Sequence, residues 1–438
     1  MMWNLDFIPN SHTLMSAGSG AGGSITELLF QLAIILVAAK AGGELFQRFI
    51  KMPPVLGELT VGIIIGPFAL GGIEIAGMGP LFGHLGNSNG GFELPVSESL
   101  WNISQIGAII LLFLAGLETD LKQFMRYAKS ATFVALGGVV VPFSLGVVLT
   151  VLFGFADNFV DVRALIMGAL LTATSIGITV RVMGDLGCLS TPEGVTILGA
   201  AVLDDVIGIL VLTIVVSLGS DADVSWGSIG FVAFKSIGFW IALMALGLVF
   251  ANRIAAFIGK FQVSGSAIAL SLALAFLAAG LSEAFGLATI IGAFSIGLAL
   301  SNTKLAHNLE SPLQSVYAFV VPVFFVVMGM LVDVRGLGSV LVFGSVLTIF
   351  AIIGKVGGSA IPALLSGFNL HGSSRIGIGM LPRGEVALIM AGLGVSKGLL
   401  DSDLYAVAII MTIVTTAIAP PALAFTFKRG GSGLRSTD

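Results

Sequence analysis

The chain is a succession of long apolar runs separated by short polar or glycine-rich connections. A helix needs roughly 20 residues to cross about 30 Å of hydrocarbon, and the runs reach this length without the polar alternation of membrane β-strands. They are blocks of Leu, Ile, Val, Ala and Gly, which predict an all-α polytopic membrane protein. About thirteen spans are predicted, at 25–50, 53–70, 101–119, 129–154, 160–184, 193–218, 226–258, 264–284, 286–302, 312–332, 338–366, 372–398 and 401–426.

Composition supports a lipid environment. Of the 438 residues, 56% are hydrophobic and only 10% are charged, against about 25% charged residues in soluble proteins. Too few polar side chains exist to cover a water-exposed surface, which excludes a soluble enzyme and a disordered chain. The net charge of −4 argues against a nucleic-acid partner. With one Cys and four His, we expect no metal centre and no cofactor.

The basic residues predict the orientation. If the N-terminus is outside, Arg163, Arg335 and Lys397 lie outside. Thirteen basic residues then lie inside: Arg48, Lys51, Lys122, Arg126, Lys129, Arg181, Arg253, Lys260, Lys304, Arg375, Lys428, Arg429 and Arg435. The positive-inside rule therefore favours an extracytoplasmic segment at 1–24 and a short cytoplasmic tail at 427–438. The expected location is a bacterial inner membrane. The segment 1–24 lacks the pattern of a cleaved signal peptide.

Two sequence patterns recur seven spans apart. The glycines of segment 55–62 have counterparts in 290–297, and the Gly and Asp of 114–121 have counterparts in 327–334. An odd shift gives the second copy the opposite orientation, as in inverted-repeat transporters. We therefore expect two inverted six-helix repeats, with 226–258 as a linker helix.

Two predicted spans carry residues that interrupt helices. The fifth contains Thr172, Thr174 and Ser175, whose hydroxyls compete for backbone hydrogen bonds. The twelfth, seven spans later, contains Leu381-Pro382-Arg383-Gly384-Glu385, where Pro and Gly break the hydrogen-bond ladder. These positions predict discontinuous crossing helices with an ion site between them. A contact of small residues in the fifth span, and a simple kink in the twelfth, are the alternatives.

A few charged residues lie deep in the spans. Asp204 and Asp205 fall near the middle of the sixth span, where a charge costs at least about 2.5–3.5 kcal/mol. Neighbours on a helix point about 100° apart, so the two carboxylates can serve different tasks. Lys355 is deep in the eleventh span and is the expected partner of one aspartate. Arg383 and Glu385 are expected to compensate charge at the helix break. Glu58 is expected at an interface rather than in the ion site.

These segments carry a family resemblance. The segments are TATSIGITVRVMGDLG at 172–187, GVTILGAAVLDDVIGILVL at 194–212, PPVLGELTVGIIIGP, FFVVMGMLVDV, IIGKVGG and LPRGEVALI. Together they resemble the monovalent cation:proton antiporter family, in its NapA/GerN-like Na⁺/H⁺ antiporter branch. The resemblance covers about residues 25–425 and implies a NhaA/NapA-like fold of thirteen helices. It implies a moving core at 129–218 and 338–426, a dimer scaffold at 25–119 and 264–332, a homodimer and an elevator-like motion.

The resemblance also assigns roles at the site. It implies that Asp205 is the main carrier of cation and proton, that Asp204 pairs with Lys355, and that Thr172, Thr174 and Ser175 contribute to the ion site. Kef-type relatives have Gln-Asp in place of Asp204-Asp205 and carry a cytosolic nucleotide-binding domain. The Asp pair here is similar to that of electrogenic exchangers, and Kef-type gating is not expected.

The expected activity is exchange of Na⁺ for H⁺, in which the two ions compete for one carboxylate site. The aspartates and Lys355 are then expected to titrate as one coupled group. Selectivity between Na⁺, Li⁺ and K⁺ depends on fine cavity geometry and stays open, as does a K⁺/H⁺ antiporter. A symporter or organic-anion carrier of the same fold, a cation channel and an intramembrane aspartyl protease are further alternatives. The protease needs aspartates facing each other from different helices, which two adjacent positions do not provide.

Overall fold

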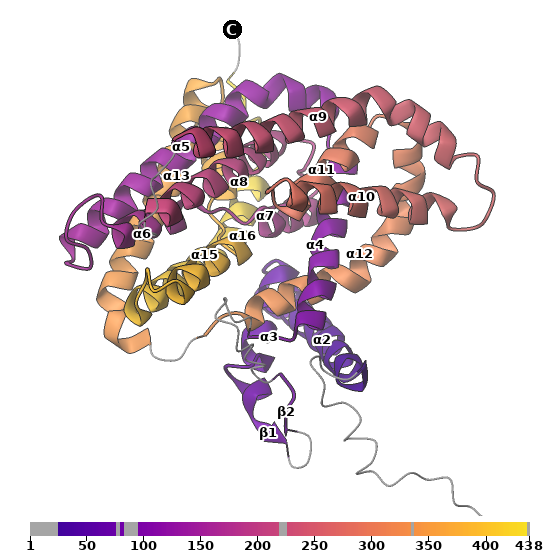
Figure 1. The fold of residues 1–438 in the computed structure, drawn as a ribbon. Helices are drawn as coiled ribbons and strands as arrows, with labels where there is room; N and C mark the ends of the chain where they lie inside the picture. The colour runs from indigo at the N-terminus through magenta and orange to yellow at the C-terminus, as the bar shows by residue number, and fades with distance from the viewer. Residues whose placement is uncertain (1–24, 76–78, 83–94, 219–225, 334–336, 436–438) are drawn as a thin grey trace, which may run out of the picture.

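The computed structural model describes residues 25–75, 79–82, 95–218, 226–333 and 337–435, and this part of the chain is predominantly helical (Figure 1). The predicted segment 1–24, Arg335 and the last three residues of the tail lie outside it. The helices are α2 (Ile25–Leu45), α3 (Pro54–Ile65), α4 (Glu98–Glu118), α5 (Leu121–Leu152), α6 (Val162–Thr172), α7 (Ile176–Asp185), α8 (Pro192–Leu218), α9 (Trp226–Ile258), α10 (Ser266–Ala284), α11 (Thr289–Leu300), α12 (Lys304–Met330), α13 (Leu341–Leu365), α14 (Leu370–Gly379), α15 (Glu385–Ser396) and α16 (Ser402–Lys428). A π-helical turn η2 (Phe46–Ile50), 3₁₀ turns η3 (Leu70–Gly72) and η4 (Leu337–Val340), and an antiparallel pair β1 (Glu74–Ile75) and β2 (Gly79–Pro80) complete the described elements.

The prediction of an all-helical membrane protein is confirmed. Among the described residues, eleven helical segments are long and apolar enough to cross a membrane. Two shorter apolar helices, Thr289–Leu300 and Glu385–Val395, lie in the predicted spans 286–302 and 372–398. The total of thirteen spans remains a prediction.

Two helices begin earlier than their apolar runs. The run at 129–154 belongs to α5, which starts at Leu121 because Asp120 caps it by accepting hydrogen bonds from the backbone N–H groups of Lys122 (2.7 Å) and Gln123 (3.3 Å). The run at 312–332 belongs to α12, whose polar first turns start at Lys304. The apolar pattern therefore locates the membrane portion of a helix, whereas the capping residues locate its start.

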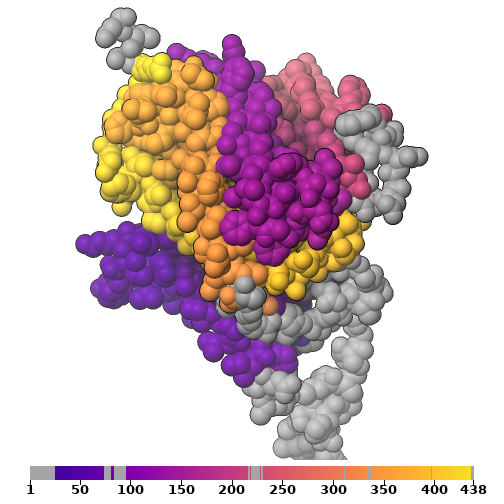
Figure 2. Space-filling view, turned by 90° about the vertical axis from the view of Figure 1, so that its left-hand side faces the viewer, coloured from indigo at the N-terminus to yellow at the C-terminus, as the bar shows by residue number. Residues whose placement is uncertain are grey.

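The helices form two groups. In the first group, α4 packs against α11 and α12, and α3 packs against α2 and α12. In the second group, α5 packs against α6, α8 and α13, while α16 packs against α13, α14 and α15. Figure 2 shows the indigo N-terminal helices as a mass of their own below the magenta and orange segments.

Glycines allow close backbone contacts inside the first group. A Cβ added to Gly116 of α4 would lie 3.0 Å from the Cα of Gly297 of α11. A Cβ added to Gly62 of α3 would lie 2.9 Å from the Cα of Gly329 of α12. Only glycine permits helices to approach this closely, as in small-residue contacts of membrane helices. All four glycines belong to the recurring sequence patterns.

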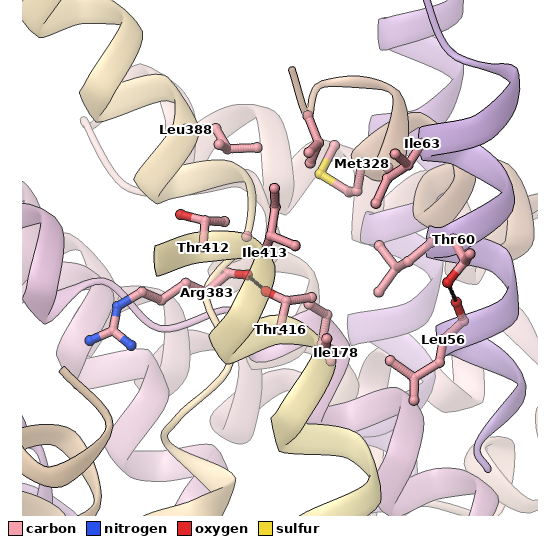
Figure 3. A pocket seen from close by; sticks show the side chains of 15 residues that line it. Leu56, Thr60, Ile63, Ile178, Met328, Arg383, Leu388, Thr412, Ile413 and Thr416 are labelled. Carbon is pink, nitrogen blue, oxygen red and sulfur yellow. Dashed lines mark hydrogen bonds between the residues drawn. The ribbon is translucent and has the colours of Figure 1, made fainter. Parts of the chain in front are cut away.

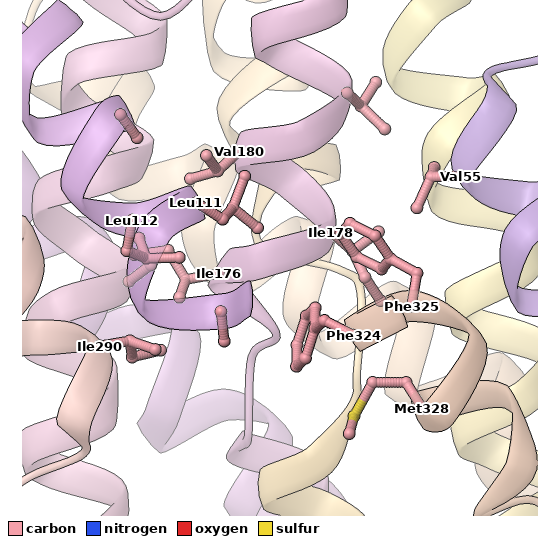
Figure 4. Packing of buried hydrophobic residues seen from close by; sticks show 14 of the residues in the cluster. Val55, Leu111, Leu112, Ile176, Ile178, Val180, Ile290, Phe324, Phe325 and Met328 are labelled. Carbon is pink, nitrogen blue, oxygen red and sulfur yellow. The ribbon is translucent and has the colours of Figure 1, made fainter. Parts of the chain in front are cut away.

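Helix α7 lies on the boundary between the two groups. Its Ile176, Ile178 and Val180 pack among apolar side chains of α4 and α12, among them Leu111 and Phe324 (Figure 4). All of these side chains are at most 2% exposed. Most of this boundary is thus held by non-directional apolar contact, which tolerates sliding better than a hydrogen-bonded surface does.

Candidate ion-binding site

The site is built at two helix breaks. Helix α6 ends at Thr172 and α7 begins at Ile176, while α14 ends at Gly379 and α15 begins at Glu385, so both predicted interruptions are present. The breaks contact each other directly, because the backbone N–H of Ser175 donates to the carbonyl of Pro382 at 2.7 Å. An interrupted helix leaves backbone groups without partners, and these have to be satisfied locally.

Hydroxyl groups of the first broken span satisfy carbonyls of the second. Thr174 Oγ1 donates to the carbonyl of Met380 at 3.2 Å, and Thr179 Oγ1 donates to that of Gly379 at 2.7 Å. Thr172 bonds within its own helix, to the carbonyl of Ala169 at 2.7 Å. The predicted polar residues of 172–175 therefore lie at the crossing and are buried.

Lys355 of α13 is fully buried and donates three hydrogen bonds. Its Nζ lies 2.9 Å from Asp204 Oδ1, 2.5 Å from the carbonyl of Thr172 and 2.9 Å from the carbonyl of Gly138. The three protons of the ammonium group are thus matched by three acceptors. The predicted contact of Lys355 with Asp204 is present, and the same ammonium group also binds the end of α6.

Arg383 provides a second cation at this helix end. It is fully buried, and its Nη2 donates to the carbonyl of Leu171 at 2.5 Å. Its own carbonyl accepts a hydrogen bond from Thr416 of α16, and its side chain points away from Thr416 (Figure 3). Because the C-terminus of a helix carries partial negative charge, Arg383 and Lys355 together stabilise the interrupted end of α6.

Glu385 lies at the N-terminal end of a helix, whereas Arg383 and Lys355 bind a C-terminal end. It is the first residue of α15, where the partial positive charge of a helix N-terminus favours a carboxylate. Its Oε2 accepts a hydrogen bond from Ser175 Oγ at 3.4 Å. Arg383 and Glu385 thus lie where the sequence predicted charge compensation.

Asp205 differs sharply from its neighbour. It is only 6% exposed, yet its Oδ2 has no hydrogen-bond partner among the described residues, whereas Asp204 is bound to Lys355. A buried polar atom without a partner is uncommon and calls for an explanation such as a bound ion, a proton or water. In the described part of the chain, no three His, Cys, Asp or Glu side chains form a metal-ligand cluster. The arrangement leaves one carboxylate oxygen available for a single small cation.

Two cavities lie on the boundary between the helix groups. One is mostly apolar and runs between α3, α12 and α16, beside the Arg383–Gly384 break (Figure 3). The other lies between α4, α7 and α12 and is lined by polar residues that include Glu118, Asp185 and Tyr317. Asp205 lines neither of these two cavities. Residues of α7 line both cavities, so the two helix groups are incompletely packed against each other beside this helix.

Two buried arginines escaped the sequence prediction, which treated them as flanking charges. Arg181 of α7 is 8% exposed and lies 3.6 Å from Glu58 of α3. Arg375 of α14 is 4% exposed and lies 2.6 Å from Glu193 of α8. The sequence contains a signal for Arg181, because apolar residues stand on both sides of it in 178–183.

Arg375 also binds the last turn of α16 and the residues that follow it. Its Nη2 donates to the carbonyl of Gly430 at 2.5 Å, its Nη1 to that of Gly431 at 3.1 Å, and its Nε to that of Thr426 at 3.2 Å. Asn369 holds the same segment through Nδ2, which donates to the carbonyls of residues 432 and 434. We call residues 430–434 the tail clamp. It joins the ends of α8, α14 and α16.

Comparisons with known proteins agree with the geometry. The sequence model of the family described as "Sodium/hydrogen exchanger, transmembrane" matches residues 32–429. The chain is 39% identical to the Na⁺/H⁺-K⁺ antiporter GerN of Bacillus cereus, over 94% of this chain and 99% of the relative. It is 36% identical to the high-affinity Na⁺/H⁺ antiporter NhaS3 of Synechocystis, over 92% and 90% of the two chains.

A solved structure gives the same fold. The sodium proton antiporter MjNhaP1 from Methanocaldococcus jannaschii superposes with a TM-score of 0.64, over 92% of this chain and 99% of the other. The two sequences are 16% identical, so this likeness concerns the fold alone.

Proposed function

The chain belongs to the sodium/hydrogen exchanger family, and on that premise we propose that it is a secondary antiporter that exchanges Na⁺ for H⁺ across a membrane. The observation that carries the proposal is Asp205, a buried carboxylate with one uncommitted oxygen beside an ion-paired Asp204. The names of GerN and NhaS3 describe Na⁺/H⁺ exchange. Exchange of K⁺ is the second candidate, because the name of GerN includes K⁺.

The proposed architecture has thirteen spans in two inverted repeats. If spans are matched seven apart, the contact of Gly62 in α3 with Gly329 in α12 corresponds to the contact of Gly297 in α11 with Gly116 in α4. The contact between α5 and α13 corresponds to itself, and there Gly137 and Gly358 each lie against the carbonyl of the other. This pattern of contacts supports a pseudo-two-fold axis in the membrane plane.

The two helix groups take the proposed roles of core and scaffold. The core, 129–218 and 338–426, contains both broken spans, both aspartates and Lys355. The scaffold, 25–119 and 264–332, contains the helices that pack through the repeat glycines, and it forms the homodimer. An elevator-like movement of the core against the scaffold would expose Asp205 to each side in turn. The apolar surface of α7 and the two neighbouring cavities suit such a movement.

The proposed mechanism is competition at Asp205. Deprotonated Asp205 binds the cation, with Thr172, Thr174 and Ser175 supplying hydroxyl or backbone oxygens at the crossing. A proton that reaches Asp205 removes its negative charge and releases the cation. Lys355 fixes and neutralises Asp204 while the cation is absent, and Asp205 is the carboxylate that binds the cation. A single carboxylate that carries either one Na⁺ or one H⁺ exchanges them one for one, which moves no net charge. We therefore propose that Lys355 releases a second proton when the cation binds and takes it up again when the cation leaves, which makes exchange electrogenic.

The proposed orientation follows the basic residues. The N-terminus lies outside and the C-terminus in the cytoplasm of a bacterial inner membrane. The ends of α7 and α16 that carry Asp185 and the tail clamp then face the cytoplasm.

Reconstitution in proteoliposomes tests the proposal. Wild-type protein is expected to move protons in response to Na⁺, and the rates with Li⁺ and K⁺ across pH rank the cations. An imposed membrane potential changes the rate if exchange is electrogenic. Asp205→Asn is expected to abolish exchange. Asp157→Asn, which changes a side chain that is 89% exposed, is the matched control and keeps activity. Full activity of Asp205→Asn would refute the assignment of the carrier.

A further inference from the structure

Two Arg–Glu pairs are buried to a similar extent, but one lies within a helix group and the other lies between the two groups. Arg375 and Glu193 belong to the same helix group, and all three guanidinium nitrogens of Arg375 donate hydrogen bonds. Arg181 and Glu58 belong to different groups, since α7 is part of the proposed core and α3 part of the scaffold. The first pair can remain intact while the groups move, whereas the second cannot.

The pair across the boundary is loosely made. The distance from Arg181 Nη2 to Glu58 Oε1 is 3.6 Å, longer than a hydrogen bond. Within the described residues, Nε and Nη1 of Arg181 and Oε2 of Glu58 have no hydrogen-bond partner, although the side chains are 10% and 3% exposed. A buried ion pair is strongly stabilising only when its remaining polar atoms are satisfied. This pair therefore separates at lower cost than the pair of Arg375 with Glu193.

Arg181 makes two further contacts, one with a residue of the scaffold and one with a residue of its own helix. Tyr317 of α12 presents its ring 5.0 Å from the guanidinium carbon, within the range of a cation–π contact. Asp185, one turn along α7, lies 3.4 Å from Nε. Glu58 and Tyr317 thus bind Arg181 from the scaffold, while Asp185 travels with it on the same helix.

We infer that Arg181 is a positioning residue of the exchange cycle: it holds core and scaffold together in one transport conformation and releases Glu58 and Tyr317 before the other is reached. The inference rests on the proposed antiport by movement of the core. Among the described residues, the neighbouring contacts of α7 with α4 and α12 are mostly apolar, so this cluster supplies polar, directional contacts between α7 and the scaffold. It biases the equilibrium between the two conformations without touching the transported ion.

The measurement that distinguishes this role from a structural one is the KM for Na⁺ on each side of the membrane. The KM for Na⁺ is measured with Na⁺ added to everted vesicles and to right-side-out vesicles. Glu58→Gln keeps the shape of the side chain and removes its charge, which lowers the population of the tethered conformation. The two KM values are expected to move in opposite directions, and their ratio to change roughly tenfold, corresponding to about 1.4 kcal/mol.

Matched variants complete the experiment. Arg181→Gln is expected to shift the ratio in the same direction as Glu58→Gln, and Arg181→Lys, which keeps the charge, to shift it less. Glu44→Gln changes an exposed carboxylate on α2, 3.9 Å from Arg48, and leaves the ratio unchanged. A ratio that stays constant in Glu58→Gln while wild-type exchange is intact overturns the inference. Absence of exchange in the wild type overturns the proposed function instead.

Amide hydrogen exchange tests the tether without transport. In Glu58→Gln, the amides of 181–185 and 55–60 are expected to exchange faster than in Glu44→Gln, because the boundary opens more often. Equal protection in the two variants refutes the tether whether or not the protein transports Na⁺.

Discussion

Replacing Lys355 by methionine tests how strongly the buried ammonium group organises the site. Methionine keeps the length of the side chain but provides none of the three donors that bind Asp204, Thr172 and Gly138. Removal of one partner of a buried ion pair costs about 3–5 kcal/mol. Asp204 can limit this cost by taking up a proton, which at pH 7 requires about 4 kcal/mol from a reference pKa of ~3.9. We therefore expect Lys355→Met to lower the free energy of unfolding by about 3–4 kcal/mol at pH 7.

Chemical unfolding of the detergent-solubilised protein at pH 7 and pH 5 measures this cost. The loss is expected to be smaller at pH 5, because protonation of Asp204 is then easier by about 2.7 kcal/mol. Addition of Asp204→Asn to Lys355→Met removes the unpaired charge and should restore part of the stability. Lys235→Met is the matched control, since Lys235 is half-buried on α9 and donates to the carbonyl of Ala284. A loss below about 1 kcal/mol at both pH values would refute the reasoning, as would a double variant less stable than Lys355→Met.

Two further predictions concern stability. Gly116→Val places side-chain atoms against the backbone of Gly297 and is expected to destabilise the protein by about 1–3 kcal/mol; an unchanged thermal midpoint in detergent would contradict the close contact. Asp161 lies before α6 and accepts hydrogen bonds from Arg163, which lower its pKa to about 2 from 3.8. Its stabilising contribution is present above pH 4 and is lost as the pH falls toward 2, so Asp161→Asn should lower stability at pH 7 by about 1 kcal/mol after allowance for solvent screening. That difference should close between pH 4 and pH 2, and a difference that stays constant there would exclude the carboxylate as its source.

The sequence predicted the helix breaks and an aspartate partner for Lys355 because both are local anomalies in apolar spans, and the family resemblance named Asp204 as that partner. Hydroxyls, Pro and Gly mark the breaks within a few residues, and a charge at mid-span requires a partner. Arg181 and Arg375 were not predicted, because each is buried by residues far away in the chain. Their partners, Glu58 and Glu193, reach them only through tertiary packing. The early starts of α5 and α12 escaped for a related reason, since their first turns are polar and lie outside the apolar runs.

The tail clamp has a consequence for the order in which the protein is assembled. During synthesis, Glu193 emerges first, Arg375 follows 182 positions later, and the carbonyls of Gly430 and Gly431 follow by a further 55 and 56 positions. Until those carbonyls leave the ribosome, the guanidinium of Arg375 lacks acceptors that it has in the folded protein. The helices of the proposed core can therefore be inserted one by one, but their final packing is a post-insertion event. A nascent chain arrested before residue 430 should remain loosely packed and open to quality-control proteases.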